Sequence, residues 1–271
     1  MRPTTKGIFV PPVVMYSKDG SLNTQEQARY FKWLEASGIT GLFLNGSSGD
    51  CVKLTAREKL SIAEVASAEV PAMYRIAGVI EPSLAMAREL ADEYWNAGAD
   101  AIAVCPPFYF KMTQSAIIDY VSALADSSKC PILLYDIPAF TTGMDEETIL
   151  VLAKHPNVVG MKDSSRNFVR FESLLAKIKP TRPDFRIFTG TEELLLASLV
   201  VGGDGATVVT AGISPADVLA IVSAFEKGDI PAAREIQLKL LPQIAEGFKG
   251  VFPAGFRKLV AKRGFNVGPD R

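Results

Sequence analysis

Lys162 is the residue of this sequence whose surroundings most clearly predict chemistry. It follows the apolar stretch Val158–Met161 and precedes Asp163, a pattern typical of a buried strand that ends in polar residues. Burial disfavours an ammonium, so we expect the pKa of Lys162 to fall and a neutral amine to form near neutral pH. Such an amine can attack a keto group and form an imine. The alternative is a lysine that reaches from the strand end into solvent.

Hydroxyl side chains occur near the ends of three other apolar stretches. Ser47 and Ser48 lie in a glycine-bounded turn, Tyr109 lies in an aromatic run, and Tyr135 lies near the end of an apolar stretch. A turn with two hydroxyls and several backbone N–H groups suits a small carboxylate. The alternatives are a plain flexible turn for the serines, an interface patch for Tyr109 and a core aromatic for Tyr135.

The composition excludes several kinds of chemistry. The 271 residues include one histidine, His155, so Ser-His-Asp triads and histidine-rich zinc sites lack material. The net charge is −1 with scattered basic residues, and no long apolar run occurs, so we expect neither a nucleic acid nor a membrane as partner. Three cysteines without CxxC spacing favour reduced thiols in the cytoplasm. No metal ion and no organic cofactor are expected.

The order of apolar and helix-period stretches predicts an α/β fold. Strand-like runs occur at Gly7–Val14, Gly41–Asn45, Met73–Val79, Ala101–Cys105, Ile132–Ile137, Val158–Lys162, Arg186–Thr189 and Ala206–Val209. The predicted helices between them have N-cap candidates at Thr24, Thr55 (with Glu58 as a capping box), Ser83, Thr113 and Asp145. Glycines at the expected helix ends are Gly38, Gly98, Gly202 and Gly228.

Eight such units predict a (β/α)8 TIM barrel over residues 1–228, followed by a small C-terminal helical appendage over residues 229–271. Two helices are expected in the appendage, at Pro231–Lys249 and Gly255–Arg263. The alternative is a doubly wound open sheet, but no GxGxxG follows the first strand. In a barrel the carboxyl ends of the strands share one mouth, which would bring the hydroxyl groups near Lys162.

Three short motifs resemble those of a known family. Gly46–Asp50 is similar to a G-[ST]-[ST]-G-E turn, Tyr135–Pro138 to a Y-N-x-P motif, and Gly160–Asp163 to a G-x-K-[DE] motif. Together, in this order, they resemble the pyruvate-dependent class I aldolases that include dihydrodipicolinate synthase, N-acetylneuraminate lyase and 2-keto-3-deoxygluconate aldolase. The resemblance extends over roughly Gly7 to Leu259.

This resemblance implies roles for individual residues. Lys162 would form the imine with the pyruvyl carbonyl, and Tyr135 would shuttle protons. Ser47 and Ser48 would hold the pyruvyl carboxylate, with Ser47 also relaying protons to Tyr135. Tyr109 resembles the relay tyrosine that one subunit contributes to its neighbour's site.

The resemblance also implies residues for the rest of the substrate. The backbone at Thr207 would contact the pyruvyl group, and Gly190 and Glu192 would meet a polyol chain. Phe140 stands where dihydrodipicolinate synthases carry an arginine that binds a carboxylate, which argues against that activity. Asp136 and Asp50 replace the usual asparagine and glutamate.

The sequence therefore predicts an enzyme, a carbon–carbon lyase that cleaves a 2-keto-3-deoxy sugar acid to pyruvate and an aldehyde. Three alternatives remain: a 2-keto-3-deoxy sugar acid dehydratase, 4-hydroxy-tetrahydrodipicolinate synthase and a non-catalytic barrel that binds a keto acid. By resemblance, the protein is expected to assemble as a homotetramer, a dimer of dimers.

Overall fold

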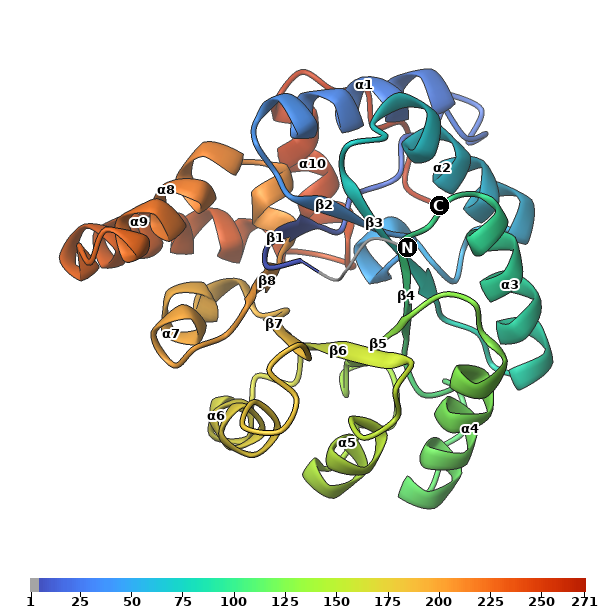
Figure 1. Cartoon of the computed structure of the whole chain (residues 1–271). Helices are drawn as coiled ribbons and strands as arrows, with labels where there is room; N and C mark the ends of the chain where they lie inside the picture. The colour runs from blue at the N-terminus through green and yellow to red at the C-terminus, as the bar shows by residue number, and fades with distance from the viewer. Residues whose placement is uncertain (1–4) are drawn as a thin grey trace.

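The eight strands of the computed structural model, which describes residues 5–271, form a closed parallel barrel with helices around it (Figure 1). Each strand pairs with the next, and β8 pairs back to β1, which confirms the predicted (β/α)8 barrel. The strands are β1 (Gly7–Val10), β2 (Gly41–Leu44), β3 (Tyr74–Val79), β4 (Ala101–Val104), β5 (Ile132–Asp136), β6 (Val158–Asp163), β7 (Arg186–Thr189) and β8 (Gly205–Thr207).

Ten α-helices and three 3₁₀ turns lie within residues 5–271. The helices are α1 (Thr24–Ala36), α2 (Ala56–Glu69), α3 (Leu84–Asn96), α4 (Gln114–Ser127), α5 (Glu146–Leu152), α6 (Phe168–Ile178), α7 (Leu195–Val200), α8 (Pro215–Glu226), α9 (Ile230–Gly247) and α10 (Ala254–Lys262). The 3₁₀ turns are η1 (Ser47–Gly49), η2 (Glu192–Leu194) and η3 (Val209–Gly212).

Most helix boundaries follow the local signals in the sequence. Thr55 and Glu58 form the predicted capping box at the start of α2. The prediction for α1 was wrong by one residue, because the side chain of Asn23, not Thr24, accepts the backbone N–H of Glu26. The predicted stop Gly38 adopts a φ of 85°, a left-handed conformation that costs glycine little.

The first and last predicted strands were too long. β1 ends at Val10 because Pro11 and Pro12 follow, and proline cannot donate to a strand ladder. β8 ends at Thr207, after which the chain turns into η3. Beyond these early ends, Pro11 and Val209 line the mouth of the barrel.

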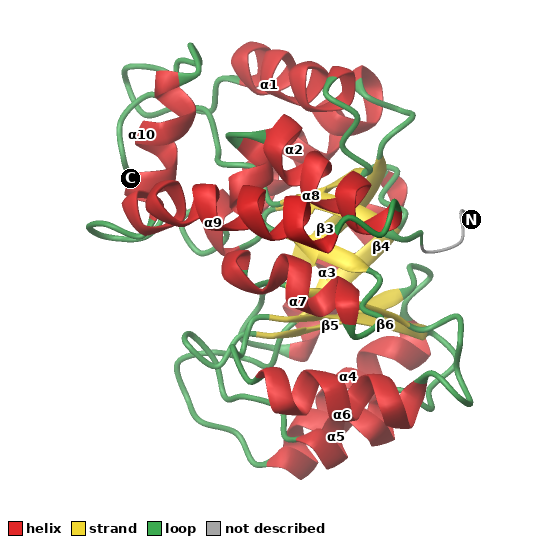
Figure 2. Ribbon diagram, turned by 90° about the vertical axis from the view of Figure 1, so that its left-hand side faces the viewer, coloured by secondary structure: helices red, strands yellow, loops and turns green. Residues whose placement is uncertain are grey.

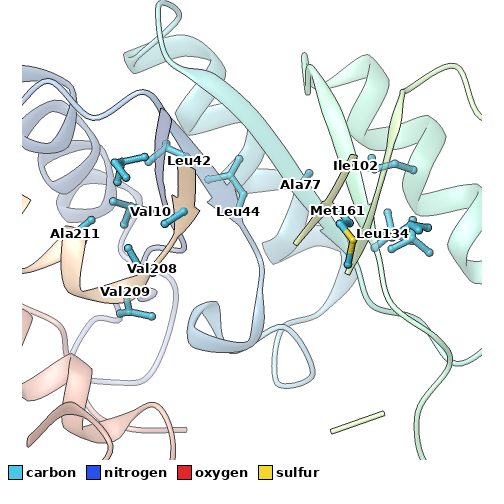
Figure 3. Close-up of a cluster of buried hydrophobic side chains, with 14 of the residues drawn as sticks. Val10, Leu42, Leu44, Ala77, Ile102, Leu134, Met161, Val208, Val209 and Ala211 are labelled. Atoms are coloured by element: carbon cyan, nitrogen blue, oxygen red, sulfur yellow. The ribbon is translucent and has the colours of Figure 1, made fainter. Parts of the chain in front are cut away.

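Alternation along the strands divides the core into two layers. Phe9, Phe43 and Phe188 belong to the cluster inside the barrel. Neighbouring residues face the helices and form the outer cluster drawn in Figure 3, which includes Val10, Leu42, Leu44, Ala77, Ile102, Leu134 and Met161. By the same alternation, Tyr135 and Lys162 point inward, while the residues that follow them point outward.

Two further helices follow the barrel, as predicted. α9 packs against α8, and α10 packs against α9 on the same side of the barrel (Figure 2). Near α10, the rings of Phe248 and Phe252 stack with centroids 6.2 Å apart, and Phe252 lies 6.1 Å from Phe140 in the loop after β5. The C-terminal segment thus reaches the mouth. Within residues 5–271, no helix combines the length and apolar character needed to cross a bilayer.

Candidate functional site

A cavity of about 450 Å³ opens at the carboxyl ends of the strands. All but one of the predicted site residues line it, namely Ser47, Ser48, Tyr135, Phe140, Lys162, Gly190, Glu192 and Thr207. They come from the ends of five strands or the loops after them, which is where barrel enzymes place their active sites. The fold therefore brings together residues that lie as much as 160 positions apart in the chain.

Lys162 lies at the bottom of this cavity with 5% of its surface exposed. Burial lowers the pKa of its ammonium to about 7, although the charge of Glu192 partly opposes this shift. Its Nζ lies 4.4 Å from the ring centroid of Phe43 and 4.3 Å from that of Tyr135. These aromatic walls keep water away from the amine. A substantial fraction of Lys162 is therefore neutral at pH 7.

Tyr135 pairs in register with Lys162 across β5 and β6. Its hydroxyl lies 3.2 Å from Ser47 Oγ, within hydrogen-bond distance. Burial raises the pKa of this phenol, and hydrogen bonds to Ser47 and Ser164 oppose the increase. The phenol stays protonated until a cation forms beside it, and the imine on Lys162 would supply that cation.

The turn that carries Ser47 and Ser48 is fixed by its neighbours. The two serines and Gly49 form η1, and the hydroxyl of Ser48 donates a hydrogen bond to the carbonyl of Pro11 at 2.9 Å. A Cβ on Gly46 would lie 2.7 Å from the ring of Phe43, so only glycine fits there. The turn is thus packed against its neighbours, which argues against the alternative of a plain flexible turn.

Asp50 closes this turn with a left-handed φ of 51°. Its Oδ2 accepts a hydrogen bond from the Tyr16 hydroxyl at 3.2 Å, and its Oδ1 lies 2.8 Å from Lys53 Nζ. The buried guanidinium of Arg257 in α10 lies 3.9 Å from Oδ2. Asp50 therefore supports the serine turn from outside the cavity rather than lining it.

β7 and β8 supply the opposite wall of the cavity. A Cβ on Gly190 would lie 2.1 Å from Ser164 Oγ and 2.8 Å from Lys162 Cε, so glycine leaves room for the lysine. Thr207 Oγ1 is buried and has no hydrogen-bond partner among the described residues. An unpaired buried hydroxyl that lines a cavity is suited to a ligand atom.

Glu192 is buried in the same wall, and burial raises the pKa of its carboxyl to about 7. Its oxygens accept the backbone N–H groups of Val209 at 2.6 Å and Thr210 at 3.0 Å. The carboxylate therefore holds the start of η3 in place. Contact with a polyol chain, expected from the sequence, would be an additional role for it.

Asp136 and Asp163 directly follow the inward-facing Tyr135 and Lys162, and their side chains lie on the outer side of the barrel wall. They are paired across β5 and β6, and both accept hydrogen bonds from Nη2 of Arg170 in α6, the second at 3.1 Å. Asp136 also accepts the backbone N–H of Met144 at 2.9 Å. One guanidinium thus joins the strand ends that carry Tyr135 and Lys162.

Tyr109 is the one predicted site residue that does not line the cavity. Its side chain is 89% exposed, and its ring packs edge-on against that of Phe110 with centroids 4.9 Å apart. Its φ of 80° is left-handed, a conformation that costs a tyrosine energy. Within one chain, Tyr109 does not join Ser47 and Tyr135.

Several residues of the cavity were not predicted. Ser164 and Arg166 lie two and four residues after Lys162, so the rule that loops after barrel strands form the mouth identifies them in principle. Thr191 lies between two predicted residues. Phe248 and Phe252 come from the C-terminal segment, and no local pattern indicates that they return to the mouth.

A closed (β/α)8 barrel with a buried, low-pKa lysine beside a tyrosine in its mouth is an arrangement that suits an imine-forming class I enzyme. Residues 4–271 match the sequence profile of the dihydrodipicolinate synthetase family, and the chain belongs to this family. It is a pyruvate-dependent class I lyase that acts on small-molecule keto acids.

Relatives of this chain have different activities. A 4-hydroxy-tetrahydrodipicolinate synthase from Thermoanaerobacter sp. is 32% identical, with 99% of this chain and 90% of that protein covered. A probable mitochondrial 4-hydroxy-2-oxoglutarate aldolase from Emericella nidulans is 29% identical over 100% of this chain and 89% of its own length. A 2-keto-3-deoxygluconate aldolase of known structure from Picrophilus torridus is 27% identical in sequence to this chain. The two structures superpose with a TM-score of 0.91 over 98% of this chain and 96% of that chain.

Proposed function

We propose that this protein is an aldolase that cleaves a 2-keto-3-deoxy sugar acid to pyruvate and an aldehyde through an imine on Lys162. The observation that carries the proposal is the contact among three groups at the bottom of the cavity. The amine of Lys162, with a pKa near 7, faces the Tyr135 ring at 4.3 Å, and the Tyr135 hydroxyl lies 3.2 Å from Ser47 Oγ.

The chemistry begins with the neutral amine of Lys162. It attacks the keto carbon of the substrate, and loss of water gives a protonated imine. Tyr135, which passes its own proton to Ser47 once the cationic imine has formed, accepts the proton of the substrate's C4 hydroxyl. The C3–C4 bond then breaks, and its electron pair forms an enamine with the imine carbon. The aldehyde leaves, Tyr135 gives the proton it accepted to C3, and water then hydrolyses the imine to release pyruvate and restore the amine.

Other residues of the cavity support this sequence of steps. The turn with Ser47 and Ser48 would hold the pyruvyl carboxylate, and Ser47 would pass the proton from Tyr135 onward. The unpaired hydroxyl of Thr207 would bind an oxygen of the pyruvyl group. Gly190 keeps the path of the lysine side chain open.

A sugar acid substrate is supported by the residues farther from Lys162. Phe140 occupies the position at which the resemblance places the carboxylate-binding arginine of dihydrodipicolinate synthases. Ser164, Thr191 and Glu192 line one side of the cavity with hydroxyl and carboxylate groups that suit a polyol chain. The relative from Picrophilus torridus is named a 2-keto-3-deoxygluconate aldolase.

We also propose that the enzyme acts in the cytoplasm as a homo-oligomer. Cys51, Cys105 and Cys130 are buried free thiols, which suits a reducing compartment. The exposed rings of Tyr109 and Phe110 offer an apolar surface to a second copy of the chain. In such an assembly Tyr109 would reach the neighbour's site.

The first test is reductive trapping. Pyruvate and cyanoborohydride should add one reduced pyruvyl group to the intact protein, and peptide mapping should place it on Lys162. Lys162→Ala should remove the adduct. A protein without any adduct would leave only the non-catalytic keto-acid binder.

A substrate panel then separates the imine enzymes. Release of pyruvate from 2-keto-3-deoxygluconate supports the aldolase. Loss of water from 2-keto-3-deoxyarabinonate without pyruvate release identifies a dehydratase. Condensation of pyruvate with aspartate semialdehyde identifies the synthase and overturns the argument from Phe140.

A further inference from the structure

Arg166 is a charged residue of the cavity that has no role in the proposed chemistry. Among the described residues that line this cavity, two have a basic side chain, Lys162 and Arg166. Lys162 is buried at the bottom, whereas the Arg166 side chain is 62% exposed at the rim. The two side chains therefore lie at the bottom and at the rim of one cavity, and Arg166 has no role in forming the imine.

The loop that presents Arg166 is held in place. The carboxylate of Asp163 accepts the backbone N–H of Ser165 at 2.8 Å, and Ser165 Oγ accepts that of Asn167 at 3.1 Å. Asp163 is itself bound by Arg170 at 3.1 Å. Arg166 has a left-handed φ of 64°, and such strain in a residue other than glycine concentrates at functional sites.

The charge of Arg166 is only weakly neutralised by the described residues of the chain. The closest carboxylate oxygen to its Nη2 is that of Glu193, at 3.8 Å, which is too long for a hydrogen bond. Its guanidinium carbon lies 5.6 Å from the ring centroid of Phe248, a cation–π contact that leaves the N–H donors free to bind a ligand. An exposed guanidinium with available donors binds carboxylates and phosphates in a bidentate manner.

The remaining rim is apolar. Phe140, Phe248 and Phe252 line this part of the cavity with aromatic rings. Beside such rings, water competes less well for the guanidinium than it does on an open surface. By resemblance, dihydrodipicolinate synthases carry an arginine at the position of Phe140 after β5, whereas this chain carries Arg166 in the loop after β6.

We propose that Arg166 binds an anionic group at the far end of the substrate, so that the substrate is a 2-keto-3-deoxy acid with a second anion, either a phosphate ester or a carboxylate. The proposal rests on the proposed function. The first carboxylate binds deep, at the turn of Ser47 and Ser48, and the second binds at the rim. Glu193 competes for the same guanidinium.

The test compares substrates that differ only at the far end: 2-keto-3-deoxygluconate, its 6-phosphate and the diacid with a carboxylate at C6. For wild-type protein, kcat/KM should be at least about tenfold higher for the 6-phosphate or the diacid than for 2-keto-3-deoxygluconate, which has no charge at C6. The charged substrate that is preferred identifies phosphate or carboxylate as the anion. Equal values for all three would overturn the proposal.

Two variants give opposite predictions. The quantity compared is kcat/KM for the preferred charged substrate divided by kcat/KM for 2-keto-3-deoxygluconate. Arg166→Gln should lower this ratio about tenfold, mainly by raising KM for the charged substrate. Glu193→Gln should raise the ratio. Arg88→Gln, which removes an exposed arginine far from the cavity, should leave it unchanged. Because each ratio is measured within one protein sample, partial unfolding does not alter it. Arg166→Gln with an unchanged ratio would contradict the proposal.

Failure of this inference differs from failure of the proposed function. If pyruvate forms no reducible adduct with wild-type protein, the imine chemistry is wrong and the role of Arg166 falls with it. If the adduct forms but the far-end anion does not affect kcat/KM, only the role of Arg166 is wrong.

Discussion

The Tyr135 ring and the Lys162 amine lie 4.3 Å apart because their residues pair in register across β5 and β6 and both point into the barrel. The Asp136 and Asp163 carboxylates that follow them point outward and bind one guanidinium, that of Arg170. The strand pairing therefore fixes the distance between the amine and the phenol, and the outer ion pairs fix the strand ends.

The pH dependence of imine formation follows from the pKa of Lys162. Burial lowers this pKa to about 7, and only the neutral amine attacks a keto group. The initial rate of pyruvate trapping by cyanoborohydride should rise about tenfold per pH unit below 7 and level off above it. A rate that continues to rise towards the ordinary lysine pKa of about 10.4 would mean that the amine is not desolvated.

The same pKa shift predicts the stability of Lys162→Met. Between about pH 7 and 10, the unfolded state binds a proton at Lys162 that the folded state does not, so the stability of the wild-type protein rises with pH over this interval. Lys162→Met removes this dependence and should be more stable than wild type at pH 7, by about 2 kcal/mol or more. Urea unfolding at pH 7 and pH 10 checks this, because the two proteins should converge at the higher pH.

Tyr135→Phe should retain the imine but lose turnover. The substitution keeps the ring beside Lys162 and removes the hydroxyl that lies 3.2 Å from Ser47 Oγ. Loss of a general acid–base group typically lowers kcat by about 100- to 10,000-fold. Steady-state kinetics and pyruvate trapping on the same sample separate the two effects. A normal kcat in Tyr135→Phe would assign the proton transfer to another group.

Gly190→Ala should displace the catalytic amine. The new methyl group would lie 2.8 Å from Lys162 Cε and 2.1 Å from Ser164 Oγ, so the lysine side chain must move. A displacement of this size costs about 100-fold in kcat/KM. Gly228→Ala is the control, because a new Cβ there has no atom within 4 Å, although the left-handed φ of 78° at Gly228 strains an alanine. The control should lose some stability and keep its kcat.

Arg170→Met should destabilise the protein in a pH-dependent manner. It leaves two buried carboxylates without their counter-ion, a change that costs about 3–5 kcal/mol near neutral pH. Burial already raises the pKa of Asp136, and loss of Arg170 raises it further. Since protonation of the folded carboxyl then offsets the lost pairing, the destabilisation should be smaller at pH 5 than at pH 8.

The control for Arg170→Met is Lys177→Met, which breaks a surface pair with Glu146. Exposed pairs contribute less than about 1 kcal/mol. Urea denaturation of both variants at the two pH values decides the matter. Equal losses in the two variants would show that the Asp136–Arg170–Asp163 network is no stronger than a surface contact.

Tyr109 should act only across two copies of the chain. The Tyr109 side chain is exposed in a single chain. Tyr109→Phe should therefore lower kcat, by about 10- to 100-fold, only in an assembly in which Tyr109 of one copy enters the active site of the next. Mixing Tyr109→Phe with Lys162→Ala should then restore activity, because hybrid assemblies contain one site with both native residues. Mixtures no more active than the Tyr109→Phe protein alone would place Tyr109 outside the reaction.

Much of the site was predictable because it follows local rules. An apolar stretch that ends in a lysine, the glycine-bounded serine turn and the alternation of strands with capped helices all depend on residues close together in the chain. The same rules missed Arg166, which lies only four residues after Lys162, because a charged loop residue looks the same whether it lines a cavity or faces open solvent.

Alternation along a strand and periodicity along a helix predicted which side chains of this protein are buried, since both patterns depend only on neighbouring residues. Which of these side chains contact one another could be read only from the folded chain. Ser47 and Tyr135 are 88 positions apart and come within 3.2 Å through closure of the barrel. Arg170 joins two carboxylates on different strands, and Phe252 returns from the C-terminal segment to Phe140. Such distances depend on the packing of the whole chain.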